Sequence, residues 1–538
     1  EVVERLHALA KEYPTLVDVW SAQAKYGLSS AGECANSDGV AVPCEQWFIR
    51  ITDKSTLAND PNRPEVFFSG NLHGNEEVGP PTLITLAELL VHNAAKYLPG
   101  GSAVGTLKNA WLHKLVQTRN IVLLPVSNAH GYFTHTRTEL GIDPNRDFPY
   151  NKAPTQCMET VVARAVNEVF MEHMFQLAIT FHGGMQAIAY EWGAPNRRDH
   201  NSESPDDAAQ ARIATRLAQY AGRFQNQLYP AGRLNSLVYP VNGGMEDWAY
   251  AAGWDTANVQ ACTPSTNGGY PAAKTSYASN GHAEAFRAFN ILVEAWDRKA
   301  PVESELGTDE AMLKVAGPGD GHVPRNLRIA LQLIDVVQPW AQFSHVDHWV
   351  QAAGCDHSLK VDLGWDVGGW YDVDSTRLIV GRWPADVAPA ELYTEPKATD
   401  ASDVAMWKEV LRGTFDTARG SALLFGEEYS GHTRWLDSSF GDFMASPFTT
   451  RFQECTVVES NHPTPPPAGD GDNARIDTYL ALAVSRLDSS WSTQGNPVPA
   501  MPPQSHIVNA RTNPDWKKSN NGKSVVGRTH FVTDVSSL

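Results

Sequence analysis

A short apolar stretch that runs into a histidine and a glutamate three residues apart constrains this chain more than any other feature. Residues 65–70 (EVFFSG) have the length and bounding turn signals of a buried strand. His73 and Glu76 follow at positions i and i+3, and on the first turn of a helix this spacing points both side chains the same way. An imidazole and a carboxylate placed in this manner can share one Zn²⁺ ion. A third ligand should then come from a distant strand end.

A second strand end supplies that ligand. The apolar run 177–181 (LAITF) ends at His182, and two glycines follow and let the backbone turn. Three protein ligands leave one position open, which is typical of catalytic rather than structural zinc sites. The His-x-x-Glu pair alone more often marks a surface pair at a helix start, so the two strand ends together carry the hypothesis. The sequence predicts one zinc ion bound by His73, Glu76 and His182.

Strand and helix patterns alternate over the first 300 residues. Apolar residues at helical spacing predict helices over 2–13, 81–98, 161–175 and 283–300. Short apolar runs such as 120–126 (NIVLLPV) predict buried strands between them. This alternation predicts an α/β fold: a mixed, mainly parallel sheet with helices on both faces.

The pattern changes after residue 300. Four segments are interpreted as strands, which favours a β-rich, sandwich-like domain over 301–460; these segments are NLRIALQLIDVV, SLKVDLGWDV, TRLIVGRW and SALLFGEEY. Residues 461–472 are rich in Pro and Gly, as a linker should be. The tail, 473–538, contains one predicted helix (NARIDTYLALAVSRL). The chain begins at Glu1 inside a helical pattern, so we expect that its start has been trimmed.

Charge and cysteine content narrow the function classes. A formal net charge of −18 argues against binding nucleic acid or an anionic membrane surface. No apolar run approaches the roughly 20 residues that span a bilayer. The six cysteines allow fifteen disulfide connectivities. A local bridge between Cys34 and Cys44 is one interpretation, with Cys355–Cys455 and Cys157–Cys262 as further pairs. These pairs favour an extracellular or secretory location, whereas six reduced thiols in a cytosolic protein are the alternative.

Four motifs occur in an order typical of one enzyme family. They are GNLHGNEEVG, GIDPNRDFP, ITFHGG and YPVNGGMEDWAY. Through them residues 1–300 resemble the zinc metallocarboxypeptidases, and are most similar to the regulatory branch that includes carboxypeptidases N, D and E. The resemblance implies a zinc carboxypeptidase-like domain that binds peptide or protein C-termini. In that branch a small transthyretin-like β domain follows the catalytic domain, and it is about half as long as the β-rich region here. We expect the β-rich region of this chain to offer a surface for a protein partner.

The resemblance also implies roles for single residues. His73, Glu76 and His182 match the zinc ligands. Asn145 and Arg146 match the pair that binds the substrate's terminal carboxylate, for which an Arg fork and an amide donor are well suited. Arg137 matches the arginine that polarises the scissile carbonyl. Tyr250 matches the mobile tyrosine that closes over the bound C-terminus.

Two positions depart from the family pattern. The alignment puts Gln260 where the family has its general-base glutamate, and an amide cannot accept a proton. Asp255, the one nearby carboxylate, should point to the other face of a strand. Gly193 stands where basic-specific relatives have an aspartate, with Glu191 shifted by two positions.

These departures leave three hypotheses. The first is a metallocarboxypeptidase that binds peptide C-termini and hydrolyses them weakly, because Gln260 replaces the base. The second is an inactive zinc-binding pseudopeptidase that serves as a binding or structural extracellular module. The third is an amide hydrolase that acts on another substrate. Turnover of peptides with varied C-terminal residues would separate them.

Overall fold

The structure is a computed structural model. It describes residues 1–57, 63–98, 107–198, 203–263, 269–277, 288–308 and 321–337, and beyond these the backbone of six strands. The chain divides into two compact units. The first includes residues 1–337, and the second includes the described strands between residues 340 and 537.

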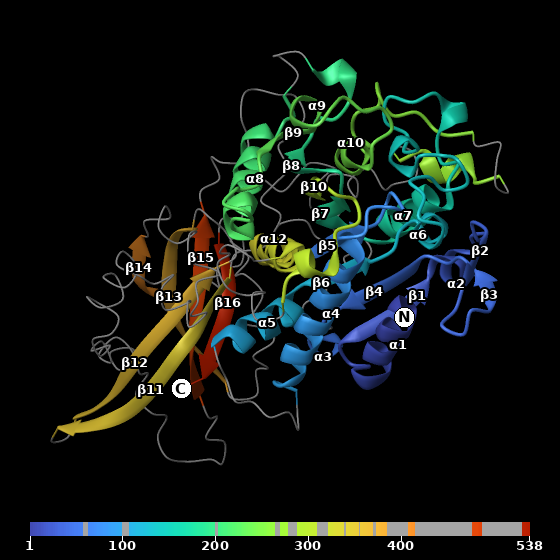
Figure 1. The fold of residues 1–538 in the computed structure, drawn as a ribbon. Helices are drawn as coiled ribbons and strands as arrows, with labels where there is room; N and C mark the ends of the chain where they lie inside the picture. Colours follow the sequence, from blue (N-terminus) through green and yellow to red (C-terminus); the bar gives the residue numbers. More distant parts are fainter. Residues whose placement is uncertain are drawn as a thin grey trace. The chain divides into compact units, whose positions relative to one another are not determined.

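An eight-stranded mixed sheet forms the centre of the first unit (Figure 1). In spatial order its strands are β1 (Val17–Ser21), β4 (Trp47–Ile51), β6 (Asn120–Leu124), β5 (Glu65–Gly70), β7 (Phe175–His182), β10 (Phe289–Trp296), β8 (Met185–Tyr190) and β9 (Ala231–Arg233). The central run from β6 through β5 and β7 to β10 is parallel, and β1, β4 and β8 join antiparallel to their inner neighbours. The α/β fold with a mixed, mostly parallel sheet is therefore confirmed.

Helices cover both faces of this sheet (Figure 1). All residues of β5, β7 and β10 are buried, as expected for strands of a parallel sheet that is covered on both sides. The longer helices of the unit are α1 (Val2–Glu12), α4 (Gly79–Ala95), α5 (Leu107–Thr118), α7 (Val161–Glu172), α8 (Asp207–Ala221), α10 (Met245–Ala251) and α12 (His322–Val336). The short ones are α2 (Ala22–Tyr26), α3 (Lys54–Leu57), α6 (Ala129–Phe133), α9 (Leu234–Leu237) and α11 (Glu303–Leu306).

Smaller elements complete the first unit. A hairpin joins β2 (Glu33–Ala35) to β3 (Ala41–Pro43). Four 3₁₀ turns are η1 (Pro144–Arg146), η2 (Pro154–Gln156), η3 (Pro195–Arg197) and η4 (Ala272–Thr275). No helix among the described residues is long and apolar enough to cross a membrane.

The described strands of the second unit form two sheets. β11 (Trp340–Ala353) pairs with β12 (Asp356–Gly368). The other sheet has the order β14 (Trp407–Thr414), β13 (Val373–Pro384), β15 (Ile476–Arg486) and β16 (His530–Ser537). The sandwich-like arrangement and the domain boundaries at residues 300, 460 and 472 stay predictions.

Three segments differ from the sequence-based expectation. Residues 289–296, expected in a helix, form strand β10, and residues 476–486, expected as the helix of the tail, form strand β15. Residues 326–337 lie in or directly after helix α12 instead of forming a strand. Each segment is a short apolar run, and apolar periodicity alone cannot separate a buried strand from a buried helix.

Two of the three proposed disulfides are present. Cys34 bonds to Cys44 across the β2–β3 hairpin, and Cys157 bonds to Cys262 across 105 residues of sequence. Both pairings confirm the expectation. Cys355 and Cys455 lie outside the described residues.

A buried contact between a glutamate and a histidine at the start of β5 connects the central strands. The Glu65 carboxylate accepts hydrogen bonds from Asn120 Nδ2 at 2.9 Å and from the Met174 amide at 2.6 Å, and it lies 2.9 Å from His173 Nδ1. Burial alone would raise the pKa of Glu65, but His173 and these donors hold it below its ordinary value of 4.5. The ionised carboxylate therefore stabilises the folded state.

We expect Glu65→Gln to lower the free energy of unfolding by about 3–5 kcal/mol at pH 7, because the histidine then loses its buried partner. The folded pKa of Glu65 lies below the unfolded value, so its contribution is present above pH 4.5 and is lost as pH falls through the folded pKa. Urea unfolding of the parent protein and of Glu65→Gln should show a difference in the free energy of unfolding that is smaller at pH 3 than at pH 7. Glu88→Gln, which removes a partly exposed partner of Arg5, should cost less than about 1 kcal/mol. An equal loss at both pH values would contradict the assignment.

Candidate metal centre and active site

Two neighbouring parallel strands bring the predicted metal ligands together. β5 and β7 pair in parallel with Gly70 opposite Phe181, so their carboxyl ends meet at one edge of the sheet. His182 is the last residue of β7, and His73 and Glu76 lie in the turn between β5 and α4. The sheet therefore positions all three ligands, as the sequence predicted.

Asn71 fixes the shape of the turn that carries His73 and Glu76. Its backbone has a positive φ of 59°, a region that Asn tolerates better than most residues. Its side-chain amide donates to the carbonyl groups of His73, Gly74 and Glu76 at 3.2, 2.9 and 3.1 Å. Gly74 has no space for a side chain, because a Cβ atom there would lie 2.0 Å from the backbone of Gly131.

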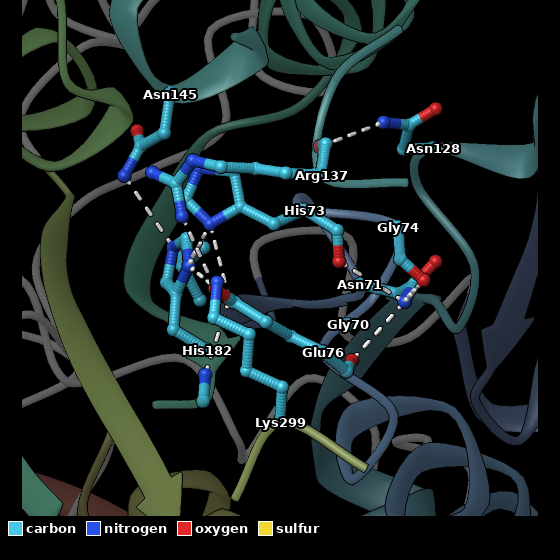
Figure 2. A network of polar contacts seen from close by, with 12 residues as sticks. Gly70, Asn71, His73, Gly74, Glu76, Asn128, Arg137, Asn145, His182 and Lys299 are labelled. Atoms are coloured by element: carbon cyan, nitrogen blue, oxygen red, sulfur yellow. Dashed lines mark hydrogen bonds and ion pairs between the residues drawn. The ribbon is translucent and has the colours of Figure 1, made fainter. Parts of the chain in front are cut away.

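The three ligand side chains converge in a buried cluster (Figure 2). Glu76 Oε2 lies 3.0 Å from His73 Nδ1 and 2.9 Å from His182 Nδ1, and the two Nδ1 atoms are 3.1 Å apart. Ligand atoms around a tetrahedral zinc ion are about 3.4 Å apart, given bonds near 2.1 Å. A small opening of the cluster would therefore admit the ion, and the donor set of two imidazoles and one carboxylate suits zinc.

Neighbouring groups orient the ligands. His73 Nε2 lies 2.9 Å from Asp143 Oδ1, which leaves Nδ1 to face the cluster. Burial would raise the pKa of Asp143, but His73, Arg137 and Arg146 hold it well below its usual range. Burial likewise opposes ionisation of Glu76, yet its two histidine partners keep its pKa well below the ordinary value. Both carboxylates are therefore ionised at neutral pH.

The predicted carboxylate-binding pair lies beside this cluster. Asn145 and Arg146 belong to η1, and the Asp143 side chain accepts a hydrogen bond from the Asn145 amide. Asn145 Nδ2 is 3.4 Å from His182 Nε2. Arg137 contacts the cluster from the other side, with Nη1 3.3 Å from Glu76 Oε1 and Nε 2.9 Å from Asp143. The structure thus brings Arg137 and Asn145 to the metal ligands.

The structure does not place Tyr250 as a mobile tyrosine. Its side chain is 1% exposed, and its hydroxyl donates to Asp206 at 2.7 Å. Tyr239, eleven residues earlier in the same motif, is 47% exposed. Its hydroxyl accepts a hydrogen bond from Arg146 Nη2 at 3.5 Å. Of the two tyrosines, Tyr239 is therefore the exposed one and the one that contacts Arg146.

The structure also does not place Gln260 on a strand at the metal site. Gln260 is exposed in a segment without regular structure, two residues before the disulfide-bonded Cys262. Glu294, on β10, lies directly opposite His182 on β7 in the parallel ladder. Paired residues of neighbouring strands point to the same face, so Glu294 points toward the metal ligands. The sequence interpretation missed Glu294 because it placed this segment in a helix.

The buried environment of Glu294 raises the pKa of its carboxyl group. It is 8% exposed, and its Oε2 atom has no hydrogen-bond partner among the described residues. Burial raises its pKa to about 7, although the charge of His182 acts in the opposite direction. A carboxyl group with such a pKa can exchange protons near neutral pH. The one carboxylate in the apolar run FNILVEAW was the signal available in the sequence.

Three further buried carboxyl groups act on one another through their charges, and one of them, Glu246, contacts Asn145. Glu246 Oε1 accepts from Asn145 Nδ2 at 3.3 Å and lies 3.8 Å from His182 Nε2, while its Oε2 has no partner among the described residues. Asp247 accepts from the amides of Gly193 and Ala194. Burial, and then the charge of Glu246, raises the pKa of Asp247 to about 7.

Glu191 is the third of these carboxyl groups. Burial, followed by the charges of Asp247 and Glu246, raises its pKa well above the ordinary value. Gly193 has no side chain that could replace the missing aspartate. A Cβ atom at this position would lie 2.3 Å from Leu234 Cδ2, so an aspartate here would displace the leucine side chain. The acidic character of this region therefore comes from Glu191, Glu246 and Asp247 instead.

Comparisons with known proteins agree with these features. A zinc carboxypeptidase family model matches residues 44–275. Carboxypeptidase D of Rattus norvegicus is 26% identical over 267 residues, which cover 46% of this chain and 17% of that protein. Carboxypeptidase SOL1 of Arabidopsis thaliana is 27% identical over 215 residues, which cover 38% and 41%. The matches thus span less than half the length of either relative.

Among solved structures, carboxypeptidase A of Helicoverpa armigera matches with a TM-score of 0.36 and 18% identity, over 61% of this chain and 67% of that chain. This likeness is too low to add to what the sheet itself shows. The family match and the ligand cluster coincide, because all three ligands lie inside the matched residues. Residues 44–275, which contain the buried cluster of His73, Glu76 and His182, are therefore similar to the zinc carboxypeptidase family.

Proposed function

We propose that this protein hydrolyses the last peptide bond of peptides or proteins and releases the C-terminal residue. Glu294 is the observation that carries this proposal. A carboxyl group opposite His182 and without a partner on one oxygen supplies the general base that Gln260 could not supply. An inactive binding module was the alternative because no base was recognised, and Glu294 favours the peptidase over it.

The side chains around the metal ligands suit the steps of this reaction. Zinc bound by His73, Glu76 and His182 would polarise the scissile carbonyl and lower the pKa of water to about 7. Glu294 takes a proton from the attacking water and returns it to the leaving amine as the carbon–nitrogen bond breaks.

Other residues bind the substrate rather than move protons. Arg146 and Asn145 bind the free carboxylate of the peptide, and the Arg137 guanidinium stabilises negative charge on the carbonyl oxygen. Tyr239 is exposed beside Arg146 and can cover the bound terminus.

The three buried carboxyl groups, of which Glu246 contacts Asn145, favour a cationic C-terminal side chain. Glu191, Glu246 and Asp247 repel one another, and the charge of Arg197 lowers the pKa of Asp247 only in part. A lysine or arginine side chain beside Glu246 would relieve this repulsion and fill the hydrogen-bonding capacity of its free oxygen.

Two disulfides support an oxidising compartment, so we place the protein in the secretory pathway or outside the cell. A protein partner of the β-rich region stays a prediction.

A direct assay tests the proposed function. The purified protein, incubated with short peptides that end in Arg, Lys or Leu, should release the last residue, as detected by mass spectrometry. Treatment with a zinc chelator should abolish release, and added Zn²⁺ should restore it. Binding of these peptides without release would favour the inactive module instead. Release of an acid from a non-peptide amide, with peptides untouched, would favour the third hypothesis.

A further inference from the structure

Loop 137–147 contains two buried carboxyl groups beside the residues that we propose to bind substrate. Glu139 follows Arg137 by two residues, and Asp147 directly follows Arg146. Both acidic residues are 1% exposed, which is rare for such side chains unless the protein supplies partners. Each carboxyl group must therefore be satisfied by hydrogen bonds from within the fold.

Both groups bind the backbone at the start of helix α7. Together they accept hydrogen bonds from four consecutive amides, those of Glu159, Thr160, Val161 and Val162. Asp147 takes the first two, at 3.0 and 2.7 Å, and Glu139 takes the last two, at 2.5 and 3.3 Å. The first amides of a helix lack partners within the helix and carry partial positive charge, so they suit two carboxylates.

Helix α7 is a well-packed support for the loop. Its residues 161–170 are all buried. The segment before the helix is fixed as well, since the Met158 amide donates to the Asp147 carbonyl at 2.7 Å. Arg164 Nε, one turn into the helix, donates to the Met158 carbonyl at 2.7 Å. The position of the loop therefore follows from the position of α7.

The loop needs this support because its own turn is strained. The backbones of Glu139 and Ile142 exchange two hydrogen bonds of 2.9 Å, which close a turn over Leu140 and Gly141. Leu140 has a positive φ of 48°, a region that residues with a side chain rarely adopt. Its side chain is more than half exposed, so its packing contributes little to holding the turn. The contacts of Glu139 with α7 hold it instead.

We propose that Glu139 and Asp147 are positioning residues, which fix loop 137–147 to α7. They thereby set the place at which Asn145 and Arg146 can bind a terminal carboxylate. In this role neither carboxyl group touches the substrate, because each acts through the backbone of the loop. The proposal rests on the proposed function in taking Asn145 and Arg146 as the carboxylate site, but it does not require hydrolysis.

Peptides that cannot be hydrolysed test this proposal. In each, a CH₂–NH group replaces the last amide, and the terminus is a carboxylate in one peptide and a carboxamide in its twin. Pairs that end in Arg and in Leu are compared first, and the pair that binds more tightly is used. Isothermal titration calorimetry of the full chain gives Kd for both twins. Burial raises the pKa of Glu139 to about 7 and that of Asp147 to about 6, so measurements at pH 8 keep both groups mainly ionised.

We expect Glu139→Ala to weaken binding of the carboxylate peptide by about 10–100-fold, the range expected when hydrogen bonds to a charged group are lost. Binding of the carboxamide twin should change by less than about twofold, as for a substitution away from the contact. Removing a negative charge would by itself strengthen binding of an anionic peptide, so net charge does not explain a weakening. Glu139→Gln keeps one acceptor oxygen in the same place and should restore most of the affinity.

Asp53→Asn is the matched control. Asp53 is 4% exposed and accepts a hydrogen bond from the Ser55 amide at 2.9 Å, at the start of α3. It follows the end of β4, which lies beside the first residues of β6, so it is at the edge of the sheet opposite the metal ligands. This variant also loses one negative charge, and it should leave the ratio of the two Kd values unchanged.

Three results would overturn the proposal: a ratio in Glu139→Ala equal to that of the parent protein, equal weakening of both peptides, or a parent protein that binds both peptides equally. Circular dichroism checks that each variant is folded. If Glu139→Ala does not fold, Asp147→Asn takes its place with the same expected direction, because it sets an NH₂ group against an amide of α7. A protein that gives the expected ratios but releases no residue from ordinary peptides would refute the peptidase and leave the positioning role intact.

Discussion

Replacing Glu294 by glutamine is expected to lower kcat/KM for peptide hydrolysis by about 10²–10⁴-fold, the usual contribution of general acid–base catalysis. Glutamine keeps the size of the side chain but cannot accept the proton of the attacking water. Glu294 is not one of the three clustered ligands, so zinc content should stay at one ion per chain. Initial rates with a peptide substrate, measured beside metal analysis of the same sample, would check both expectations.

Gln260 provides the control for this experiment. It is exposed and lies outside regular structure, so Gln260→Ala should keep activity within about twofold of the parent protein, as surface substitutions usually do. The opposite pattern, with activity lost in Gln260→Ala and kept in Glu294→Gln, would show that the sequence alignment was right and that the position of Glu294 has no catalytic meaning.

The second large effect concerns the choice of substrate. We expect Glu246→Gln to reduce the preference for C-terminal Arg over C-terminal Leu by about 10²–10⁴-fold, since removing one partner of a buried ion pair costs about 3–5 kcal/mol. The measured quantity is the ratio of kcat/KM for two peptides that differ in the last residue. Because the ratio compares two substrates on one enzyme, a general loss of activity cancels.

An exposed glutamate gives the matched comparison for that ratio. Glu203 has 44% of its side chain exposed and pairs with Arg233, so Glu203→Gln should leave the ratio unchanged. If the parent protein prefers Leu, or if Glu246→Gln leaves an Arg preference intact, Glu246 and the two neighbouring carboxyl groups do not bind the side chain of the substrate.

The metal ligands could be predicted from the sequence because each follows directly from a strand end. His73 and Glu76 are three residues apart in one turn, and His182 ends an apolar run, so local pattern and parallel topology lead to the same edge of the sheet. Asn145 was predicted from a short motif and Arg137 from its spacing before that motif, and the structure brings both side chains to the metal ligands. These are positions where local sequence and tertiary position agree.

Glu294 and Tyr239 were missed for physical reasons. A base had been sought between Asp247 and Cys262, yet a long stretch of sequence separates α10 from β10, which carries Glu294, the base that we propose. β10 is buried on both faces, so its sequence lacks the alternation that identifies a half-exposed strand. Tyr239 and Tyr250 stand at the two ends of one motif, and their exposure, which the sequence does not contain, is what separates them.

The position of Glu294 on a strand rather than a loop has a consequence for how this protein tolerates change. His182 and Glu294 are paired residues of the neighbouring strands β7 and β10. The distance between them therefore does not depend on the lengths of the connections on either side. Deleting one residue early in β10 would turn Glu294 to the opposite face. Insertions in surface loops would leave the pair in place. Strand β10, with eight residues, is thus a segment that tolerates little change in length, and directed-evolution libraries should leave it intact.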